Sequence, residues 1–323
     1  MIDRNGRSID YLRISITDRC NLRCMYCMPE EGVGAMEHAQ ILSFEEILRI
    51  VRIMTGLGIL HLRLTGGEPM ARRGCLDLAR RLHEIPGIES ISMTSNGILL
   101  MDKVRQAKES GISSLNISID ALNPGTYYSL TRGGDVRKAL CTFYQALDEG
   151  MKVKINTVPV RGINEDDLAP IAELARKDPV CVRFIELMPI GAGSRMERIP
   201  TGEVRRKLED IFGAGAEDTR PHGHGPARYV KFPGFAGSVG FISAVSHEFC
   251  KTCNRVRLTA DGQLKLCLNH TKGIDLRDML RAGADDTEIL DAVRSAIGEK
   301  PARHAFYEQI SDHEERSMNE IGG

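Results

Sequence analysis

Residues 11–17, YLRISIT, decide the fold, because their alternation of apolar and polar side chains is typical of a strand and recurs along the chain. Similar runs are HLRLTGG (61–67), SISMTSN (90–96), SLNISID (114–120), KVKINTV (152–158) and VCVRFIEL (180–187). They return about every 30 residues, and each is followed by a stretch with the apolar spacing of a helix. Strands that alternate with helices in this way predict βα units and a parallel sheet.

The number of these units predicts an α/β fold built on a partial (βα)6 TIM-type barrel. A standard barrel of this type has eight units, whereas the runs stop at residue 187. A stretch rich in Gly and Pro, residues 214–240, then marks a domain boundary near residue 218. We therefore expect a barrel domain over residues 1–218 and an α+β region over residues 219–323 that closes the barrel, with the functional loops at the C-terminal ends of the strands.

The C-terminal region carries its own strand and helix patterns. Residues 227–232 and 238–243 read as short strands, and residues 256–268 read as a hairpin that turns at Asp261-Gly262. Two closing helices are expected at residues 274–283 and 287–298.

The composition describes an ordinary globular protein of 323 residues, of which 42% are hydrophobic. The formal net charge of −1 provides no global basic field to hold nucleic acid. No run approaches the roughly 20 apolar residues that cross a bilayer, and the start of the chain lacks the apolar segment of a signal peptide. We therefore expect a cytoplasmic protein that binds neither nucleic acid nor a membrane.

The cysteines favour metal binding or catalysis over disulfides, because the chain has nine of them and no export signal. Six fall into two tight groups: Cys20, Cys24 and Cys27, and Cys250, Cys253 and Cys267. The remaining three, Cys75, Cys141 and Cys181, are interpreted as small buried hydrophobic residues.

The first cysteine group follows the first predicted strand directly, so one loop presents three thiolates at the C-terminal end of that strand. Thiolates are soft ligands that suit iron-sulfur clusters or zinc. A 4Fe-4S cluster held by three of them keeps one iron free for another ligand. The spacing alone also allows a zinc site that is completed by a distant histidine such as His38.

The second cysteine group leaves the same two alternatives, and its spacing alone does not separate them. His247 together with Cys250, Cys253 and Cys267 could form a closed zinc site of three Cys and one His. Arg255 and Arg257 favour the open cluster, because two arginines that point the same way on a strand beside the metal suit an anionic ligand.

Three further cations occupy polar positions of predicted barrel strands: Arg13, Arg63 and Lys154. Together with Arg255 and Arg257 they should face one interior. Buried cations without partners are costly, so five that converge predict a highly charged guest such as a nucleoside triphosphate. Polar side chains at the same barrel mouth are Thr94, Asn96, Asn116, Ser118 and Asp120.

The run CNLRCMYCMP at residues 20–29, followed by TGGEP at residues 65–69, resembles the radical S-adenosylmethionine (SAM) superfamily. The resemblance implies that the first three cysteines hold a 4Fe-4S cluster whose free iron binds the amino and carboxylate groups of SAM. It also implies that the glycine-rich segment lets backbone groups approach the methionine end of SAM.

Both cysteine groups and the terminal Ile321-Gly322-Gly323 together resemble the GTP 3',8-cyclase family within that superfamily. The resemblance implies a second 4Fe-4S cluster on Cys250, Cys253 and Cys267, whose open iron meets the guanine. It implies SAM contacts at Tyr26, Gly67, Ser118 and Met188, and GTP contacts at Arg13, Arg63, Thr94, Lys154, Arg255 and Arg257. Arg255 and Arg257 are also expected to take part in the reaction, as are Gly322 and Gly323 of the tail.

The activity implied by the resemblance is conversion of GTP to (8S)-3',8-cyclo-7,8-dihydroguanosine 5'-triphosphate, the first step of molybdenum cofactor biosynthesis. A reducing electron-donor protein is then an expected partner, and a homodimer is left open. Two other classes remain as alternatives. One is a radical SAM enzyme that modifies peptides with an auxiliary cluster, and the other is a non-enzymatic iron-sulfur or zinc protein.

Overall fold

The computed structural model describes residues 1–246, 249–306 and 314–322. Its strands form one 12-stranded sheet in the order β12-β11-β10-β1-β2-β3-β4-β5-β6-β9-β8-β7. The strands are β1 (Tyr11–Ser15), β2 (His61–Thr65), β3 (Ser90–Ser95), β4 (Ile112–Ser118), β5 (Lys152–Thr157), β6 (Cys181–Ile185), β7 (Ala216–Asp218), β8 (Arg228–Lys231), β9 (Ser238–Ile242), β10 (Arg255–Leu258), β11 (Gln263–Lys265) and β12 (Gly273–Asp275).

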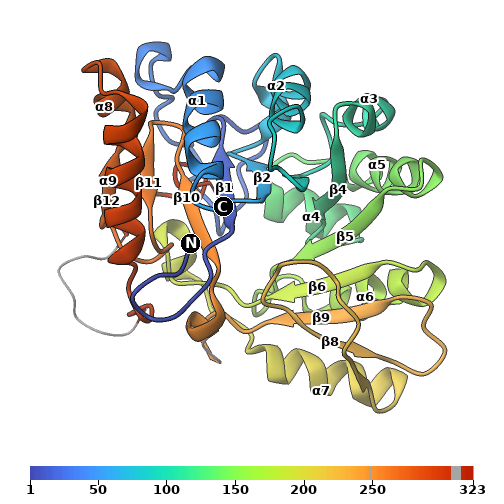
Figure 1. Cartoon of the computed structure of the whole chain (residues 1–323). Coiled ribbons are helices and arrows are strands. Elements are labelled where there is room, and N and C mark those ends of the chain that lie inside the picture. The colour runs from blue at the N-terminus through green and yellow to red at the C-terminus, as the bar shows by residue number, and fades with distance from the viewer. Residues whose placement is uncertain (247–248, 307–313, 323) are drawn as a thin grey trace.

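The helices lie along the outer side of the curved sheet, as Figure 1 shows for α1, α2, α3 and α5. They are α1 (Phe44–Thr55), α2 (Cys75–His83), α3 (Val104–Glu109), α4 (Pro124–Thr131), α5 (Val136–Asp148), α6 (Leu168–Lys177), α7 (Thr201–Phe212), α8 (Leu276–Arg281) and α9 (Asp286–Gly298). Within the described ranges, none of these helices combines the length and the apolarity that crossing a membrane requires.

The six alternating runs become β1 to β6, which follow one another in the sheet and pair in parallel. Helices lie between these strands along the chain. The prediction of a partial α/β barrel is confirmed. The local reason is visible in β1, where Leu12 and Ile14 are fully buried in the core between the sheet and the helices, while Arg13 points to the other side.

The C-terminal region lengthens the sheet at both of its edges. β9 pairs in parallel with β6, and the antiparallel strands β8 and β7 follow it. β10 pairs in parallel with β1 at the opposite edge, and β11 and β12 continue it as antiparallel strands. The predicted hairpin is therefore β10–β11, and Gly262 adopts a positive φ of 92° in its turn.

Local signals explain where the main helices begin. α1 starts at a capping box, in which the Ser43 hydroxyl accepts from the Glu46 amide and the Glu46 carboxylate accepts from the Ser43 amide. α9 starts in the same way at Asp285 and Glu288. α9 packs beside α1, so this C-terminal helix lies on the outside of the barrel (Figure 1).

Candidate active site

The sheet topology places the two cysteine groups at opposite ends of neighbouring strands. β1 and β10 are parallel, and the first group follows β1 whereas Cys250 and Cys253 precede β10. β11 runs antiparallel to β10, so Cys267, which follows β11, returns to the same end as Cys253. The interior between the two groups is a cavity that Cys250, Cys253 and Cys267 line.

The first cysteine loop holds its thiols in a partly buried setting. The Leu22 amide donates to the Cys20 Sγ over 3.4 Å, and the Cys27 amide donates to the Cys24 carbonyl over 2.9 Å. Burial raises the pKa of the Cys20 thiol to about 11, and burial together with the nearby Cys20 raises that of Cys27 to about 12. Thiols of this kind become thiolates when they bind a metal, which is the chemistry that an iron-sulfur cluster requires.

The glycine pair of TGGEP packs directly against the backbone that leads into this loop. A Cβ on Gly67 would lie 2.4 Å from the Arg19 carbonyl oxygen, and one on Gly66 would lie 2.5 Å from the Thr17 carbonyl oxygen. The Gly67 amide donates to the Thr17 carbonyl over 2.8 Å. Glycine is required here because no side chain fits between the two segments, so the pair fixes the position of the cysteine loop.

Glu68 of the same segment is completely buried and joins the ends of two strands. Its carboxylate accepts from the Asn96 amide over 2.8 Å and from the Ser95 hydroxyl over 2.9 Å. Burial raises its pKa to about 7. Glu68 thereby ties the loop after β2 to the end of β3, beside the first cysteine loop.

Three of the four predicted SAM contacts line the cavity: Tyr26, Ser118 and Met188. Gly67 is not among the residues that line it, because it packs on the cysteine loop instead. The Tyr26 hydroxyl donates to Asp120 Oδ2 over 2.7 Å, and the Val158 amide donates to Asp120 Oδ1 over 2.7 Å. Asp120 is fully buried, and burial raises its pKa to about 6.

Residues that sequence reasoning missed hold the second cysteine loop in place. Arg7 is buried and bound to Asp3 over 2.6 Å, and its guanidinium donates to the Cys250 carbonyl over 3.0 Å. Its Nη2 donates to the Lys300 carbonyl over 3.0 Å and to the Pro301 carbonyl over 2.8 Å. One side chain therefore ties the N-terminal segment, the cysteine loop and the end of α9 together. The sequence offered no signal for these contacts, because the carbonyl acceptors in the cysteine loop and after α9 lie more than 240 residues away.

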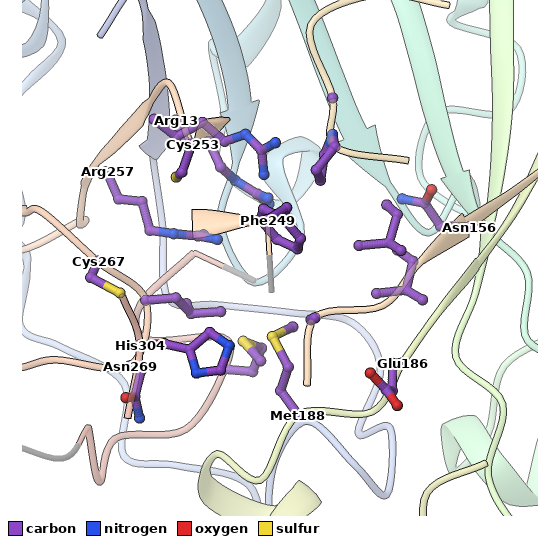
Figure 2. Close-up of a pocket in the computed structure, with 18 of the residues that line it drawn as sticks. Arg13, Asn156, Glu186, Met188, Phe249, Cys253, Arg257, Cys267, Asn269 and His304 are labelled. Carbon is purple, nitrogen blue, oxygen red and sulfur yellow. The ribbon is translucent and has the colours of Figure 1, made fainter. Parts of the chain in front are cut away.

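Strand register places the predicted cations side by side on the inner face of the sheet. Arg13 faces Arg257 on one neighbouring strand and Arg63 on the other, and Tyr11 faces Arg255. In Figure 2, Arg257 reaches into the cavity from the side of Cys253 and Cys267, while Asn156 and Glu186 lie across from it.

The cations destabilise one another's charged forms. Burial, followed by the charge of Arg255, lowers the pKa of Arg257 to about 10. Burial lowers the pKa of Arg13 well below its usual value, and Arg257 and Arg63 add to the effect. A polyanion between these side chains would relieve both the repulsion and the desolvation, which fits a triphosphate.

Lys154 lies on the inner face but does not line this cavity. It is in register with Asn116 and Cys181, and its ammonium donates to the His222 carbonyl. Burial, followed by the charge of Arg183, lowers its pKa to about 8. The loop that binds it is held by the His222 ring, which lies 3.1 Å from Cys181 Sγ and 2.9 Å from Asp218 Oδ2.

Two polar atoms beside the cavity have no hydrogen-bond partner among the described residues: Thr94 Oγ1 and Arg183 Nε. Thr94 was a predicted GTP contact, whereas Arg183 was missed, although VCVRFIEL shows the same alternation as the other strands. The Arg183 guanidinium also donates to the Asn116 and Asn156 amide oxygens, both over 2.5 Å. A buried donor without a partner costs free energy, so a ligand that pairs with it gains affinity.

The end of the chain enters the barrel interior. Arg257 donates to the Gly322 carbonyl over 2.9 Å, and a Cβ on Gly322, whose φ is 75°, would lie 2.8 Å from Ser15 Cβ. Ile321 is 1% exposed. Gly323 lies outside the described residues.

Each of the two zinc alternatives depended on a histidine. In the described ranges, no group of three His, Cys, Asp or Glu side chains is arranged to hold a single metal ion. His38 is exposed on a short 3-10 turn, and His247 lies outside the described residues.

Among the isolated cysteines, Cys75 and Cys181 are buried as expected, whereas the expectation for Cys141 is wrong, since α5 exposes it.

Two protein-family models match successive parts of the chain. The Radical SAM superfamily model matches residues 14–175, and Molybdenum Cofactor Synthesis C matches residues 180–306. GTP 3',8-cyclase of Pelotomaculum thermopropionicum is 46% identical over 327 residues, and GTP 3',8-cyclase of Clostridium perfringens strain SM101 is 42% identical over 323 residues; both alignments cover all of each chain. Streptococcus suis SuiB bound to S-adenosylmethionine shares the fold, with a TM-score of 0.62 and 14% identity over 89% of this chain and 68% of that one.

Proposed function

The chain belongs to the GTP 3',8-cyclase family of the radical SAM superfamily, and from this premise we propose that two 4Fe-4S clusters face each other across one cavity in which GTP binds. Its function is that of a GTP 3',8-cyclase in molybdenum cofactor biosynthesis. This membership decides against a peptide-modifying enzyme and against a non-enzymatic metal protein.

The observation that carries this proposal is the row of arginines between the two cysteine loops. Arg257, Arg13 and Arg63 are neighbours in register, and Cys253 and Cys267 line the same cavity as all three. The thiol sets fit iron-sulfur clusters by donor chemistry, and the arginines fit the phosphates of GTP. When bound, the first cluster and SAM supply the one-electron chemistry that removes a hydrogen atom from the substrate.

The residues of this chain bind and orient SAM and GTP and enclose them in the cavity. Tyr26, held by Asp120, together with Ser118 and Met188 is proposed to line the SAM side of the cavity. Thr94 Oγ1, which has no partner in the described part of the chain, is proposed to bind GTP. Positioning dominates catalysis in such a site, because the substrate carbon that loses its hydrogen atom must stay in contact with the group that removes it.

The tail is proposed to take part in the reaction through Gly322 and Gly323. Support comes from the hydrogen bond between Arg257 and the Gly322 carbonyl and from the burial of Ile321. A terminus without side chains can enter a crowded cavity and bring its backbone close to the substrate. A reducing electron-donor protein is the remaining proposed partner.

The direct test is incubation of anaerobically reconstituted protein with SAM, GTP and a strong reductant. We expect 5'-deoxyadenosine and the cyclised nucleotide to appear together, and we expect ATP in place of GTP to give no cyclised product. Formation of 5'-deoxyadenosine without a cyclised product from GTP would contradict the proposal.

Replacement of Arg255 or Arg257 by Ala should weaken GTP binding by about 1–3 kcal/mol, the range for a charge-assisted hydrogen bond to an anion. SAM binding should barely change. Arg52→Ala, which removes an exposed arginine of α1 on the outside of the barrel, serves as the control. Titration calorimetry measures both ligands, and unchanged GTP affinity in both cavity variants would show that these arginines are structural.

Lys154 should give GTP turnover a pH dependence on the alkaline side, because its ammonium holds the His222 carbonyl and the same loop continues into cavity-lining residues from His224 to Pro226. Its pKa of about 8 lies below the ordinary 10.5, so the ammonium loses its charge as the pH rises through 8. We expect kcat/KM for GTP, which reports the free enzyme, to fall above about pH 8. Lys154→Arg keeps the charge and should remove this decline. If kcat/KM still falls above about pH 8 in Lys154→Arg, another titrating group causes the decline and the prediction for Lys154 is wrong.

A further inference from the structure

Residues 314–322, which we call the tail strap, are mostly buried or half-buried although they lie at the end of the chain. Asn319 is 2% exposed and Ile321 is 1% exposed. Chain ends are usually poorly ordered unless specific contacts hold them. Specific contacts therefore hold the tail strap in place.

One set of contacts joins the tail strap to the first cysteine loop. The Met318 amide donates to the Cys27 carbonyl over 3.2 Å, and the Asn319 side-chain amide donates to the Asp18 carbonyl over 3.0 Å. Both acceptors lie in or next to the loop that carries the first three cysteines. The middle of the tail strap is thus tied to the SAM side of the cavity.

A second set joins the start of the tail strap to the second cysteine loop. The Glu314 amide donates to the Asn269 carbonyl over 2.8 Å, and the Glu314 carboxylate makes an ion pair with Lys265. Lys265 ends β11 and lies two residues before Cys267. The tail strap therefore spans the distance between the two cysteine loops.

The Lys265–Glu314 ion pair is the most buried element of this connection, since both side chains are 1% exposed. The Lys265 ammonium also donates to the His270 carbonyl over 2.7 Å, and Arg316 supports the Glu314 carboxylate over 3.1 Å. A buried ion pair is a poor source of stability, because desolvation offsets the attraction. It does fix geometry, because only one arrangement satisfies both charges.

We propose that the Lys265–Glu314 pair is a positioning device that anchors the tail strap between the two cysteine loops and so sets how far Gly322 reaches toward Arg257. This rests on the proposed role of the tail in the reaction. Lys265 and Glu314 touch neither substrate nor cofactor in this scheme. They act through the nine residues that end at Gly322, and they determine how often SAM cleavage leads to cyclised GTP.

The quantity that reports this role is the coupling ratio, the amount of cyclised product formed per 5'-deoxyadenosine. A displaced tail leaves the first cysteine loop able to support SAM cleavage. It misaligns the groups that the cyclisation of GTP requires. Misplacement of about 1 Å costs up to about 100-fold in rate. We therefore expect Glu314→Gln, which keeps the shape and removes the charge, to lower the coupling ratio by about 10- to 100-fold.

The experiment compares three reconstituted variants with the unmodified protein. They are Glu314→Gln, a chain that lacks Gly322 and Gly323, and Glu299→Gln as the matched control. Glu299 pairs with Lys272 over 2.8 Å, but that pair is 41–56% exposed and includes no residue of the tail strap, so its loss should leave the coupling ratio unchanged.

A second readout is independent of turnover. In the protein without SAM and GTP, Glu314→Gln should accelerate hydrogen exchange at two amides of the tail strap. They are Met318, which donates to the Cys27 carbonyl, and Glu320, which donates to the Ser317 carbonyl. Unchanged exchange would overturn the proposal even if activity fell. If Glu314→Gln loses iron, Arg316→Gln, which weakens the same anchor at a half-buried side chain, decides in its place.

The outcomes separate this inference from the function on which it rests. A lower coupling ratio in both the truncated chain and Glu314→Gln supports the anchor. A lower ratio in the truncated chain alone overturns the anchor and leaves the tail's role intact. If neither variant changes the ratio while GTP is still cyclised, the tail has no part in the reaction and the proposed positioning device is refuted with it.

Discussion

Simultaneous replacement of Cys20, Cys24 and Cys27 by Ala is expected to abolish SAM cleavage and to lower the iron content from about eight to about four per chain, on the assumption of two four-iron clusters. The physical reason is that these three thiols are the ligands that the loop after β1 offers, and no SAM is cleaved without the metal that they bind. Iron and sulfide analysis after anaerobic reconstitution, together with detection of 5'-deoxyadenosine, measures both effects.

The control for this variant is Cys141→Ala. Cys141 is exposed on α5, outside the barrel interior, so its loss should change neither iron content nor SAM cleavage. A decrease in the control would indicate that the protein is sensitive to cysteine replacement in general. Retained SAM cleavage in the triple variant would refute the assignment of the first cluster to this loop.

The parallel core of the fold could be predicted from the sequence because its signals are local. Alternation with a period of two identifies a strand wherever it lies, as Leu12 and Ile14 show, and the helix between two such runs makes them parallel neighbours. The placement of β9 and β10 at opposite edges of the sheet could not be predicted in this way. It depends on pairing between segments that are far apart in the sequence, such as Tyr11 with Arg255.

The site was predictable where a residue type and a strand position coincide. Arg13 and Arg63 were identified because each sits at a polar position of an alternating run, and strand register then brings them together. Lys154 meets the same criterion, yet its ammonium turns to the His222 carbonyl. His222 lies in a Gly- and Pro-rich stretch without periodicity, so no sequence pattern indicates where its carbonyl points.

Residues that support the site from a distance were the hardest to predict. Arg7 holds the second cysteine loop through backbone carbonyls, which every residue possesses, so no side-chain pattern reveals its partners. Lys265 and Glu314 meet across 49 residues of sequence and are recognisable as a pair only from their burial. Positions of this kind follow from tertiary packing rather than from local sequence.

The second cysteine group should affect the two halves of the reaction differently. Cys250 and Cys253 precede β10 and Cys267 follows β11, so they lie at the end of the barrel opposite the loop after β1. Removal of these three thiols therefore leaves the SAM side of the cavity standing, including the hydrogen bond between Tyr26 and Asp120.

Replacement of Cys250, Cys253 and Cys267 together by Ala is accordingly expected to abolish cyclised product while part of the SAM cleavage remains. The iron content should fall to about four per chain, as in the first triple variant. Chromatography of the nucleotides after single-turnover incubation measures the product, and 5'-deoxyadenosine from the same sample measures the cleavage. Cys75→Ala, which alters a buried thiol in the hydrophobic core, is the matched control for a cysteine outside both groups. Unchanged cyclised product in the triple variant would remove the second cluster from the reaction.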